Sequence, residues 1–131
     1  MRKILLDTNA YTALLQGDKS ILEELGKSDF VYMPSIVLGE LFAGFRGGNR
    51  ENGNKTLLEK FLKKPGVEVV NVTRETAEVF GEIKYILTKA GTPLPINDVW
   101  IASCALETGA VVLTRDAHFS KIPGLRIWSQ D

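Results

Sequence analysis

The stretch Lys3-Ile4-Leu5-Leu6-Asp7-Thr8-Asn9 decides the fold class of this chain. Its apolar residues are continuous and do not alternate with polar ones, which is the pattern of a strand covered on both faces in a parallel sheet. The run stops at Asp7, and a helical pattern follows it. In an open α/β sheet, functional groups gather at the carboxyl edge of the strands. We therefore expect Asp7 to lie at that edge.

Four further apolar segments are typical of strands, and helical patterns separate them. We predict these strands at residues 30–33, 67–72, 111–113 and 125–128, with the last at an edge of the sheet. Helices between strands imply crossover connections, so the sheet should be mostly parallel with helices on both faces. At 131 residues the chain has the size of one domain. We expect residues 1–131 to form a single three-layer α/β/α domain.

Capping residues and glycines mark the expected helices. The predicted helices span residues 9–15, 20–26, 36–45, 56–63, 74–90 and 98–107. Residues 46–54 hold three glycines and three asparagines, so we expect a loop there. The predicted N-terminal caps are Ser20, Ser35, Thr73, and Asn97 or Asp98.

The charges and the metal-binding residue types limit the possible functions. The formal net charge is zero, so only a local patch could hold a polyanion such as a nucleic acid or a membrane surface. The single Cys104 excludes an intrachain disulfide and a cysteine-based zinc site, and the single His118 excludes a multi-histidine centre. A metal would therefore be one that prefers oxygen ligands. No segment has the length of a signal peptide core or a membrane span, and we expect a cytoplasmic protein.

Four acidic residues are candidates for one site: Asp7, Glu40, Asp98 and Asp116. Each has an ordinary explanation by itself. Asp7 and Asp98 could cap helices, Glu40 could lie on an exposed helix face, and Asp116 could occupy a turn. The three aspartates nevertheless follow a strand or begin a helix at the same edge of the sheet, where like charges repel. A divalent cation would offset this repulsion, and hard oxygen ligands favour Mg²⁺ or Mn²⁺.

The chain resembles the PIN-domain ribonucleases, and within them the VapC-type toxins of prokaryotic toxin–antitoxin pairs. The resemblance covers essentially the whole chain. Four motifs carry the resemblance: ILLDTN at 4–9, PS at 34–35 followed by GEL at 39–41, NDVWIA at 97–102, and LTRDAHF at 113–119. The segment GTPLP at 91–95 also resembles the family. Each motif alone is weak evidence, but the four motifs in this order and at this spacing make the resemblance specific. The implied fold is PIN-like.

The resemblance also implies an activity and partners. The four acids match the acidic quartet of the family, which holds Mg²⁺ or Mn²⁺ and orients the water that attacks an RNA phosphodiester. Asn9 and Thr114 match polar residues that support the quartet by hydrogen bonds, and we expect the same of Ser35. The family forms homodimers and is inhibited by a cognate VapB-type antitoxin, whose basic side chain enters the acidic pocket. An arginine or lysine there offers the carboxylates another counter-charge.

The segment from residue 46 to 64 is locally basic, with six basic residues against two acidic ones, a balance of +4. It follows the predicted Glu40 helix and could track an RNA backbone, although a solvated loop and helix face explains it equally well. Arg115 adjoins Asp116, and its guanidinium fork fits phosphate oxygens. The candidate RNA contacts are Arg46, Arg50, Lys60, Lys63, Lys64 and Arg115.

Several other side chains have an ordinary and a functional interpretation. We predict that His118 is structural or peripheral, because in this mechanism the metal activates the water. Trp100 lies on the apolar side of its helix and is expected in the core or an interface. Tyr11, Leu14 and Leu15 fit core burial as well as a dimer or antitoxin groove.

Other functional classes share parts of this pattern. A phospho-acceptor receiver domain needs paired acids after its first strand and an acceptor aspartate after its middle strand. The strand predicted at 67–72 runs instead into Asn71-Val72-Thr73. A haloacid-dehalogenase phosphatase needs an aspartate two positions after its nucleophile, where this chain has Asn9. A PIN-like RNA-binding module with weak catalysis is disfavoured because all four acids are present.

Overall fold

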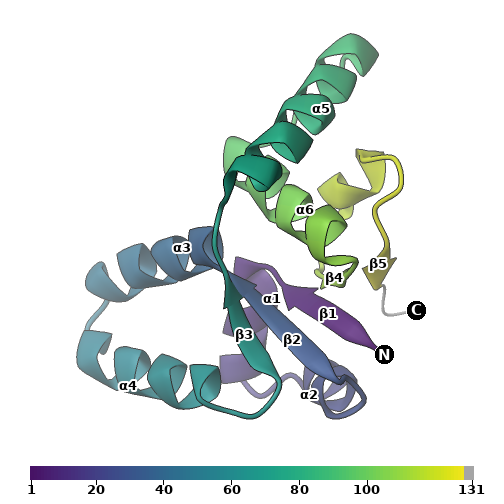
Figure 1. Cartoon of the computed structure of the whole chain (residues 1–131). Helices are drawn as coiled ribbons and strands as arrows, with labels where there is room; N and C mark the ends of the chain where they lie inside the picture. The colour runs from purple at the N-terminus through teal and green to yellow at the C-terminus, as the bar shows by residue number, and fades with distance from the viewer. Residues whose placement is uncertain (129–131) are drawn as a thin grey trace.

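A five-stranded parallel sheet forms the centre of the computed structural model, which describes residues 1–128 (Figure 1). Its strands are β1 (Lys3–Leu6), β2 (Phe30–Pro34), β3 (Val67–Val70), β4 (Val111–Leu113) and β5 (Ile127–Trp128). They lie in the order β3-β2-β1-β4-β5, and all neighbouring strands are parallel. The predicted three-layer α/β/α architecture with a mostly parallel sheet is confirmed.

The central position of β1 explains its continuous apolar sequence. The strand pairs with β2 on one side and with β4 on the other. Ile4, Leu5 and Leu6 are at most 1% exposed. A strand with helices on both faces has no solvent-facing side, so polar residues cannot alternate along it.

Within residues 1–128, six α-helices and one 3₁₀ helix connect and follow the strands. Their bounds are α1 (Thr8–Leu15), α2 (Lys19–Gly26), α3 (Ser35–Arg46), α4 (Glu51–Leu62), α5 (Arg74–Ala90), α6 (Ile96–Thr108) and η1 (Ala117–Lys121). Figure 1 shows α5 and α6 as a pair above the sheet and α3 and α4 as a second pair beside it. No helix among residues 1–128 is both long and apolar enough to cross a bilayer.

Aromatic contacts fix the packing between helices. Tyr11 of α1 is fully buried and meets the ring of Phe61 in α4 edge-on, with 5.4 Å between the centroids. Trp100 of α6 stacks on Phe80 of α5 at 3.9 Å. Trp100 is therefore a packing residue, as predicted, and burial in the core accounts for Tyr11.

Several predicted boundaries and caps were wrong. Helix α4 begins at Glu51 instead of residue 56, because the Glu51 carboxylate lies in the first helical turn and pairs with Arg46 and Lys55.

The cap of α2 is Asp18 instead of Ser20. Pro34 and Pro95 directly precede α3 and α6, so these helices begin at Ser35 and Ile96, earlier than predicted. Ser35 and Asp98 thus lie inside the first turn and do not cap. Strand β3 ends at Val70, and β5 starts at Ile127.

The strand order creates a crevice at the carboxyl edge between β1 and β4. The chain first adds β2 and β3 on one side of β1, and then β4 and β5 on the other, so the order reverses at β1 and β4. Ligands of open α/β sheets bind at such a reversal. Pairing of Leu6 with Leu113 brings the residues that follow, Asp7 and Thr114, to this point. The order also differs from the 2-1-3-4-5 order of the receiver-type sheet, which excludes that alternative.

Candidate metal centre

A cavity of about 100 Å³ lies at this crevice, and all four candidate acids line it. Asp7 follows β1, Asp116 follows β4, Glu40 lies in α3, and Asp98 lies in the first turn of α6. The rest of the lining is Thr8, Asn9 and Ile101. The structure thus brings together four carboxylates that are separated by up to 109 positions in the sequence. No lysine or arginine belongs to this lining.

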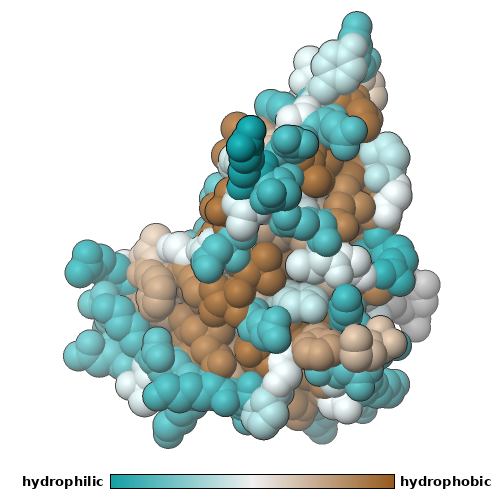
Figure 2. All heavy atoms as spheres, viewed as in Figure 1, coloured by the Kyte–Doolittle hydropathy of each residue, from teal (hydrophilic) through white to brown (hydrophobic). Residues whose placement is uncertain are grey.

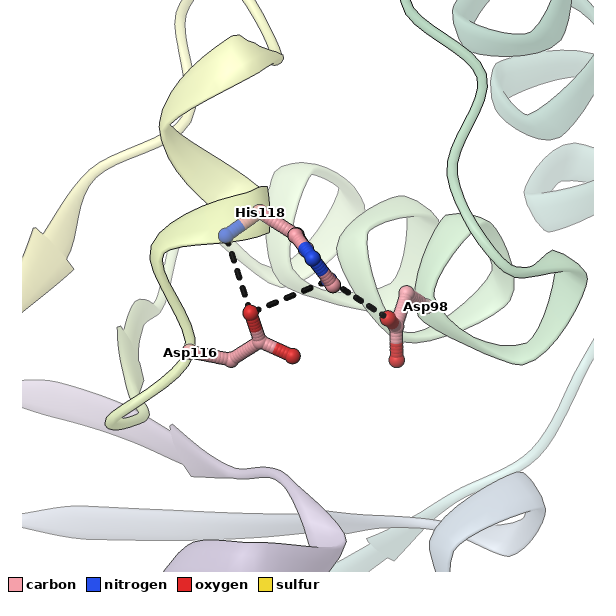
Figure 3. A group of neighbouring side chains, drawn as sticks. All are labelled: Asp98, Asp116 and His118. Carbon is pink, nitrogen blue, oxygen red and sulfur yellow. Dashed lines mark hydrogen bonds and ion pairs between the residues drawn. The ribbon is translucent and has the colours of Figure 1, made fainter.

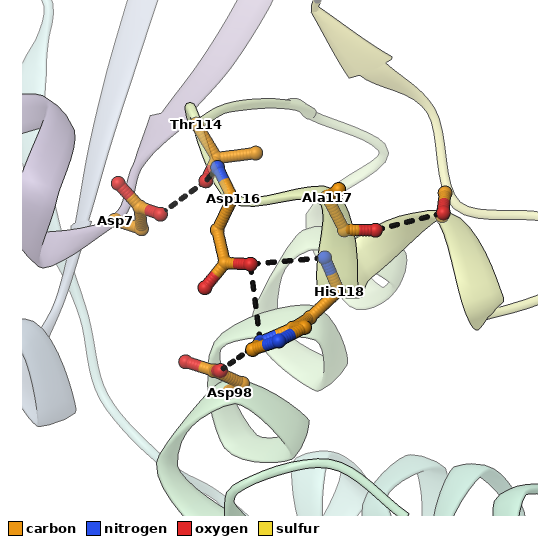
Figure 4. A network of polar contacts seen from close by, with 7 residues as sticks. Asp7, Asp98, Thr114, Asp116, Ala117 and His118 are labelled. Atoms are coloured by element: carbon orange, nitrogen blue, oxygen red, sulfur yellow. Dashed lines mark hydrogen bonds and ion pairs between the residues drawn. The ribbon is translucent and has the colours of Figure 1, made fainter. Parts of the chain in front are cut away.

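Asp7 is held rigidly by two hydrogen bonds. Its Oδ1 accepts the backbone N–H of Ala10 at 2.8 Å, so the predicted helix cap exists. Its Oδ2 accepts the hydroxyl of Thr114 (Figure 4). The Thr114 hydroxyl also accepts the backbone N–H of Asp116 at 2.9 Å. Thr114 therefore joins the acid after β1 to the turn after β4, as the resemblance implied for this residue.

Glu40 is oriented by a residue that the sequence reasoning missed. The hydroxyl of Thr8 donates to Oε1 of Glu40 at 2.6 Å. Within residues 1–128, Oε2 of Glu40 has no hydrogen bond. The signal for Thr8 was its position: it directly follows Asp7 at the same edge of the sheet. A charge-assisted bond of this length fixes the carboxylate while leaving the second oxygen available.

His118 lies beside two of the acids, at the rim of the cavity, and its side chain is 51% exposed. Its Nδ1 is 3.0 Å from Oδ1 of Asp116 and 4.0 Å from Oδ2 of Asp98 (Figure 3). Ligand atoms of these three residues lie within 4.8 Å of one another. The reason is local: η1 begins directly after Asp116, whose Oδ1 accepts the His118 backbone N–H at 2.9 Å and turns the ring toward the cavity.

The electrostatics of the cavity oppose the charged form of its acids. Burial is the main cause that raises the pKa of Asp7, and the charges of Asp116 and Glu40 raise it further against the hydrogen bonds from Thr114 and Ala10. Burial, followed by the charges of Asp116, Glu40 and Asp7, raises the pKa of Asp98, whereas His118 lowers it. Added positive charge is therefore favourable in this cavity.

The remaining predicted residues lie at different distances from this cavity. Asn9 lines it, whereas Ser35 begins α3 and makes no hydrogen bond to the four acids within the described part of the chain. Arg115 pairs with Asp18 and lines a different cavity next to Asp116. Of the basic segment, Arg50 lines a groove next to Glu40. Arg46 pairs with Glu51, while Lys60, Lys63 and Lys64 are exposed.

The fold agrees with the comparisons to known proteins. The model of the family described as "PIN domain" matches residues 4–125, so the chain belongs to the PIN-domain family. It is 30% identical over 111 residues to Ribonuclease VapC2 of Rickettsia felis, covering 84% of this chain and 81% of that protein. It is 31% identical over 130 residues to the tRNA(fMet)-specific endonuclease VapC of Salmonella typhimurium, covering 97% of both. Within the PIN family, the chain belongs with the VapC ribonucleases.

Two solved structures show the same fold over nearly the whole chain. One is VapBC2 from Rickettsia felis bound to a DNA fragment from their promoter, with a TM-score of 0.86, 28% identity, and coverage of 98% and 99% of the two chains. The other is DNA-bound VapBC from Salmonella typhimurium, with a TM-score of 0.88, 30% identity and 98% coverage of both chains. Both are complexes named VapBC.

Proposed function

We propose that this chain is an endoribonuclease that hydrolyses RNA phosphodiester bonds at the four-carboxylate cavity and depends on Mg²⁺ or Mn²⁺. The observation that carries the proposal is the convergence of Asp7, Glu40, Asp98 and Asp116 on one small cavity with no basic side chain in its lining. The curated relatives named as ribonucleases support the same reaction class.

The donor set fits a hard divalent cation. All four acidic ligands offer oxygen, and His118 adds one nitrogen at the rim. Burial and mutual repulsion raise the pKa values of Asp7 and Asp98, so a doubly charged ion relieves an unfavourable arrangement. When bound, the ion supplies positive charge that stabilises the phosphate and lowers the pKa of water.

The protein's own residues hold this donor set in place. Thr114 and the Ala10 N–H fix the Asp7 carboxylate, and Thr8 fixes that of Glu40. Asp98 lies in the first turn of α6, and the next residues of that helix include the buried side chains of Val99, Ile101 and Ala102. The orienting groups are already in position, so little reorganisation is needed when substrate binds.

The test is cleavage of total RNA by the purified chain with Mn²⁺ or Mg²⁺. Wild type should cut, and Asp7→Asn and Asp98→Asn should each lose activity by at least about 100-fold while keeping their circular dichroism spectra. Glu82→Gln, which removes an exposed carboxylate of α5, is the control and should cut like wild type. Cleavage at the wild-type rate by Asp98→Asn with metal present would contradict the assignment.

We further propose that a cognate VapB-type antitoxin inhibits the chain and that the chain forms a homodimer. The solved relatives named VapBC complexes support the antitoxin. Hydrophobic residues gather on one face over the region of α3 and α4 (Figure 2). Phe42 of α3 and Leu57 of α4 are 39% and 48% exposed. Apolar surface of this kind is typical of protein contacts. Adding the antitoxin should stop cleavage and weaken Mn²⁺ binding.

A further inference from the structure

A second cavity adjoins the acid cavity and shares two of its residues. It has a volume of about 460 Å³ and lies between α1, α3 and the first turn of α4. Thr8 and Glu40 line both cavities. We call the second cavity the α1–α3–α4 groove. A ligand that reaches the acids can therefore extend into this groove without leaving the protein surface.

The lining of the groove offers both apolar and hydrogen-bonding surface. The exposed apolar side chain of the lining is Leu15 of α1, at 39% exposure, and the largely buried Leu41 and Phe45 of α3 complete the apolar part. Gln16 and Asn54 contribute side-chain amides, which can donate and accept hydrogen bonds. Unpaired bases of single-stranded RNA are recognised by such a combination, an apolar surface for the ring and polar groups for its edges.

Among the described residues, Arg50 is the one cation in the lining of this groove. It directly precedes α4, and its backbone carbonyl accepts the N–H of Asn54 at 2.9 Å, so the two residues are one turn apart. Within residues 1–128, Arg50 has no ion pair. Arg46 differs from Arg50 in its ion pairing and in its position. It pairs with Glu51 at 3.4 Å, and it lines a cavity on the opposite face of α3. The segment thus turns one unpaired guanidinium toward the groove.

We propose that the α1–α3–α4 groove binds the nucleotide next to the scissile phosphate of single-stranded RNA. Arg50 contacts the phosphate of that nucleotide, the base packs on the apolar lining, and the amides of Gln16 and Asn54 contact the base edge. The inference rests on the proposed ribonuclease function. Among the basic residues of the segment 46–64, it assigns RNA binding first to Arg50. It also predicts that the amides of Gln16 and Asn54 determine which nucleotide is preferred.

The first experiment measures RNA binding apart from cleavage. Every variant carries Asp98→Asn, and the probe is a fluorescent single-stranded RNA of mixed sequence titrated at several salt concentrations. Arg50→Ala should weaken binding roughly tenfold and reduce the slope of log K against log salt by about 0.7, the value for one phosphate contact on a single strand. Arg50→Lys should keep the slope, because it keeps the charge. The control Lys27→Ala removes an exposed charge at the end of α2 and should change neither quantity.

The second experiment maps the ends of RNA cut by otherwise wild-type protein. Gln16→Ala and Asn54→Ala should cut with a changed nucleotide preference at a single position beside the cleavage site, and Glu82→Gln should keep the wild-type preference. The groove assignment is overturned if Arg50→Ala keeps the salt slope of RNA binding and if Gln16→Ala and Asn54→Ala keep the wild-type nucleotide preference. Cleavage of RNA by wild type would still support the ribonuclease function in that case. Weakened antitoxin binding with unchanged RNA binding in Arg50→Ala overturns the groove assignment in favour of a protein occupant. A wild type that cuts no RNA with Mn²⁺ contradicts the ribonuclease itself.

Discussion

The hydroxyl of Thr8 donates a 2.6 Å hydrogen bond to Oε1 of Glu40, which joins the first turn of α1 to the middle of α3. The two residues are 32 positions apart in the chain. Glu40 lies on a helix flanked by Gly39, so no bulky neighbour on that side restricts its side chain. The Thr8 bond supplies this restriction and holds the carboxylate at the acid cavity.

Removing the Thr8 hydroxyl should therefore weaken metal binding. Thr8→Val keeps the shape of the side chain but loses the donor, and we expect Mn²⁺ affinity to fall by about 10- to 100-fold, as for other residues that orient metal ligands. Thr8→Ser should keep most of the affinity. Mn²⁺ titration followed by electron paramagnetic resonance measures the effect. Thr88→Val, on the exposed side of α5, is the control. Equal affinities in all variants would show that Glu40 does not need this bond.

The Thr114 hydroxyl should matter for stability as well as for the site. It donates to Oδ2 of the buried Asp7 carboxylate and accepts the Asp116 N–H, so Thr114→Val removes the hydrogen bonds of both atoms. We expect the free energy of unfolding to fall by about 1–3 kcal/mol in urea denaturation. Thr114→Ser should lose much less, and Thr56→Val on an exposed face of α4 should be nearly neutral. A loss in Thr114→Val no larger than in Thr56→Val would refute the role.

Asp98→Asn should stabilise the metal-free protein at neutral pH. Burial and the charges of Asp116, Glu40 and Asp7 raise the pKa of Asp98 in the folded state above its ordinary value of 3.8. The folded state therefore binds the proton more tightly than the unfolded state, and wild-type stability falls as pH rises from 3.8 through the raised pKa. Above that window the whole penalty applies, so the melting temperature of Asp98→Asn at pH 7 should exceed that of wild type by about 2–6 °C.

Two controls accompany this comparison. The advantage of Asp98→Asn should disappear when the pH falls well below 3.8, because Asp98 is then protonated in both states. The stabilisation gained on adding Mn²⁺ should also be smaller in the variant. Glu82→Gln should show neither effect. A melting temperature at pH 7 that is equal to or below that of wild type would show that repulsion at Asp98 is unimportant.

The lysines of α4 and its C-terminal end test the broader RNA-binding prediction. Replacing Lys60, Lys63 and Lys64 with alanine in the Asp98→Asn background should reduce the salt slope of RNA binding by about 2, if all three contact phosphates. The control is the triple replacement of Lys27, Lys84 and Lys89, which lie on α2 and α5. If both triple variants show the same salt slope of RNA binding, the lysines of α4 and its C-terminal end do not contact the RNA.

The fold class could be predicted from the sequence alone, because the burial of a segment shows directly in its pattern of apolar residues. The apolar run before Asp7 has no alternation, and this is the pattern of a strand covered on both faces, which β1 is. The acids could be predicted for a similar reason, since three of them follow a strand or begin a helix, where parallel topology brings them to one edge. The start of α4 could not be predicted, because its glycine and asparagines have low helix propensity, and the pairing of Glu51 with Arg46 and the burial of Leu58 and Phe61 arise only in the folded chain.

Only the tertiary structure decided which side chains touch the acids. Thr8 and His118 look ordinary in the sequence, and their roles come from Glu40, Asp98 and Asp116, which reach them from other elements. The strand order was equally hidden, because the pattern of apolar residues does not say on which side of β1 the next strand is added. Periodicity is a local property and records burial, whereas a hydrogen bond between distant residues depends on how the elements pack. The sequence therefore determined the sheet and its acidic edge, and the packing of α1, α3, α6 and η1 determined the site.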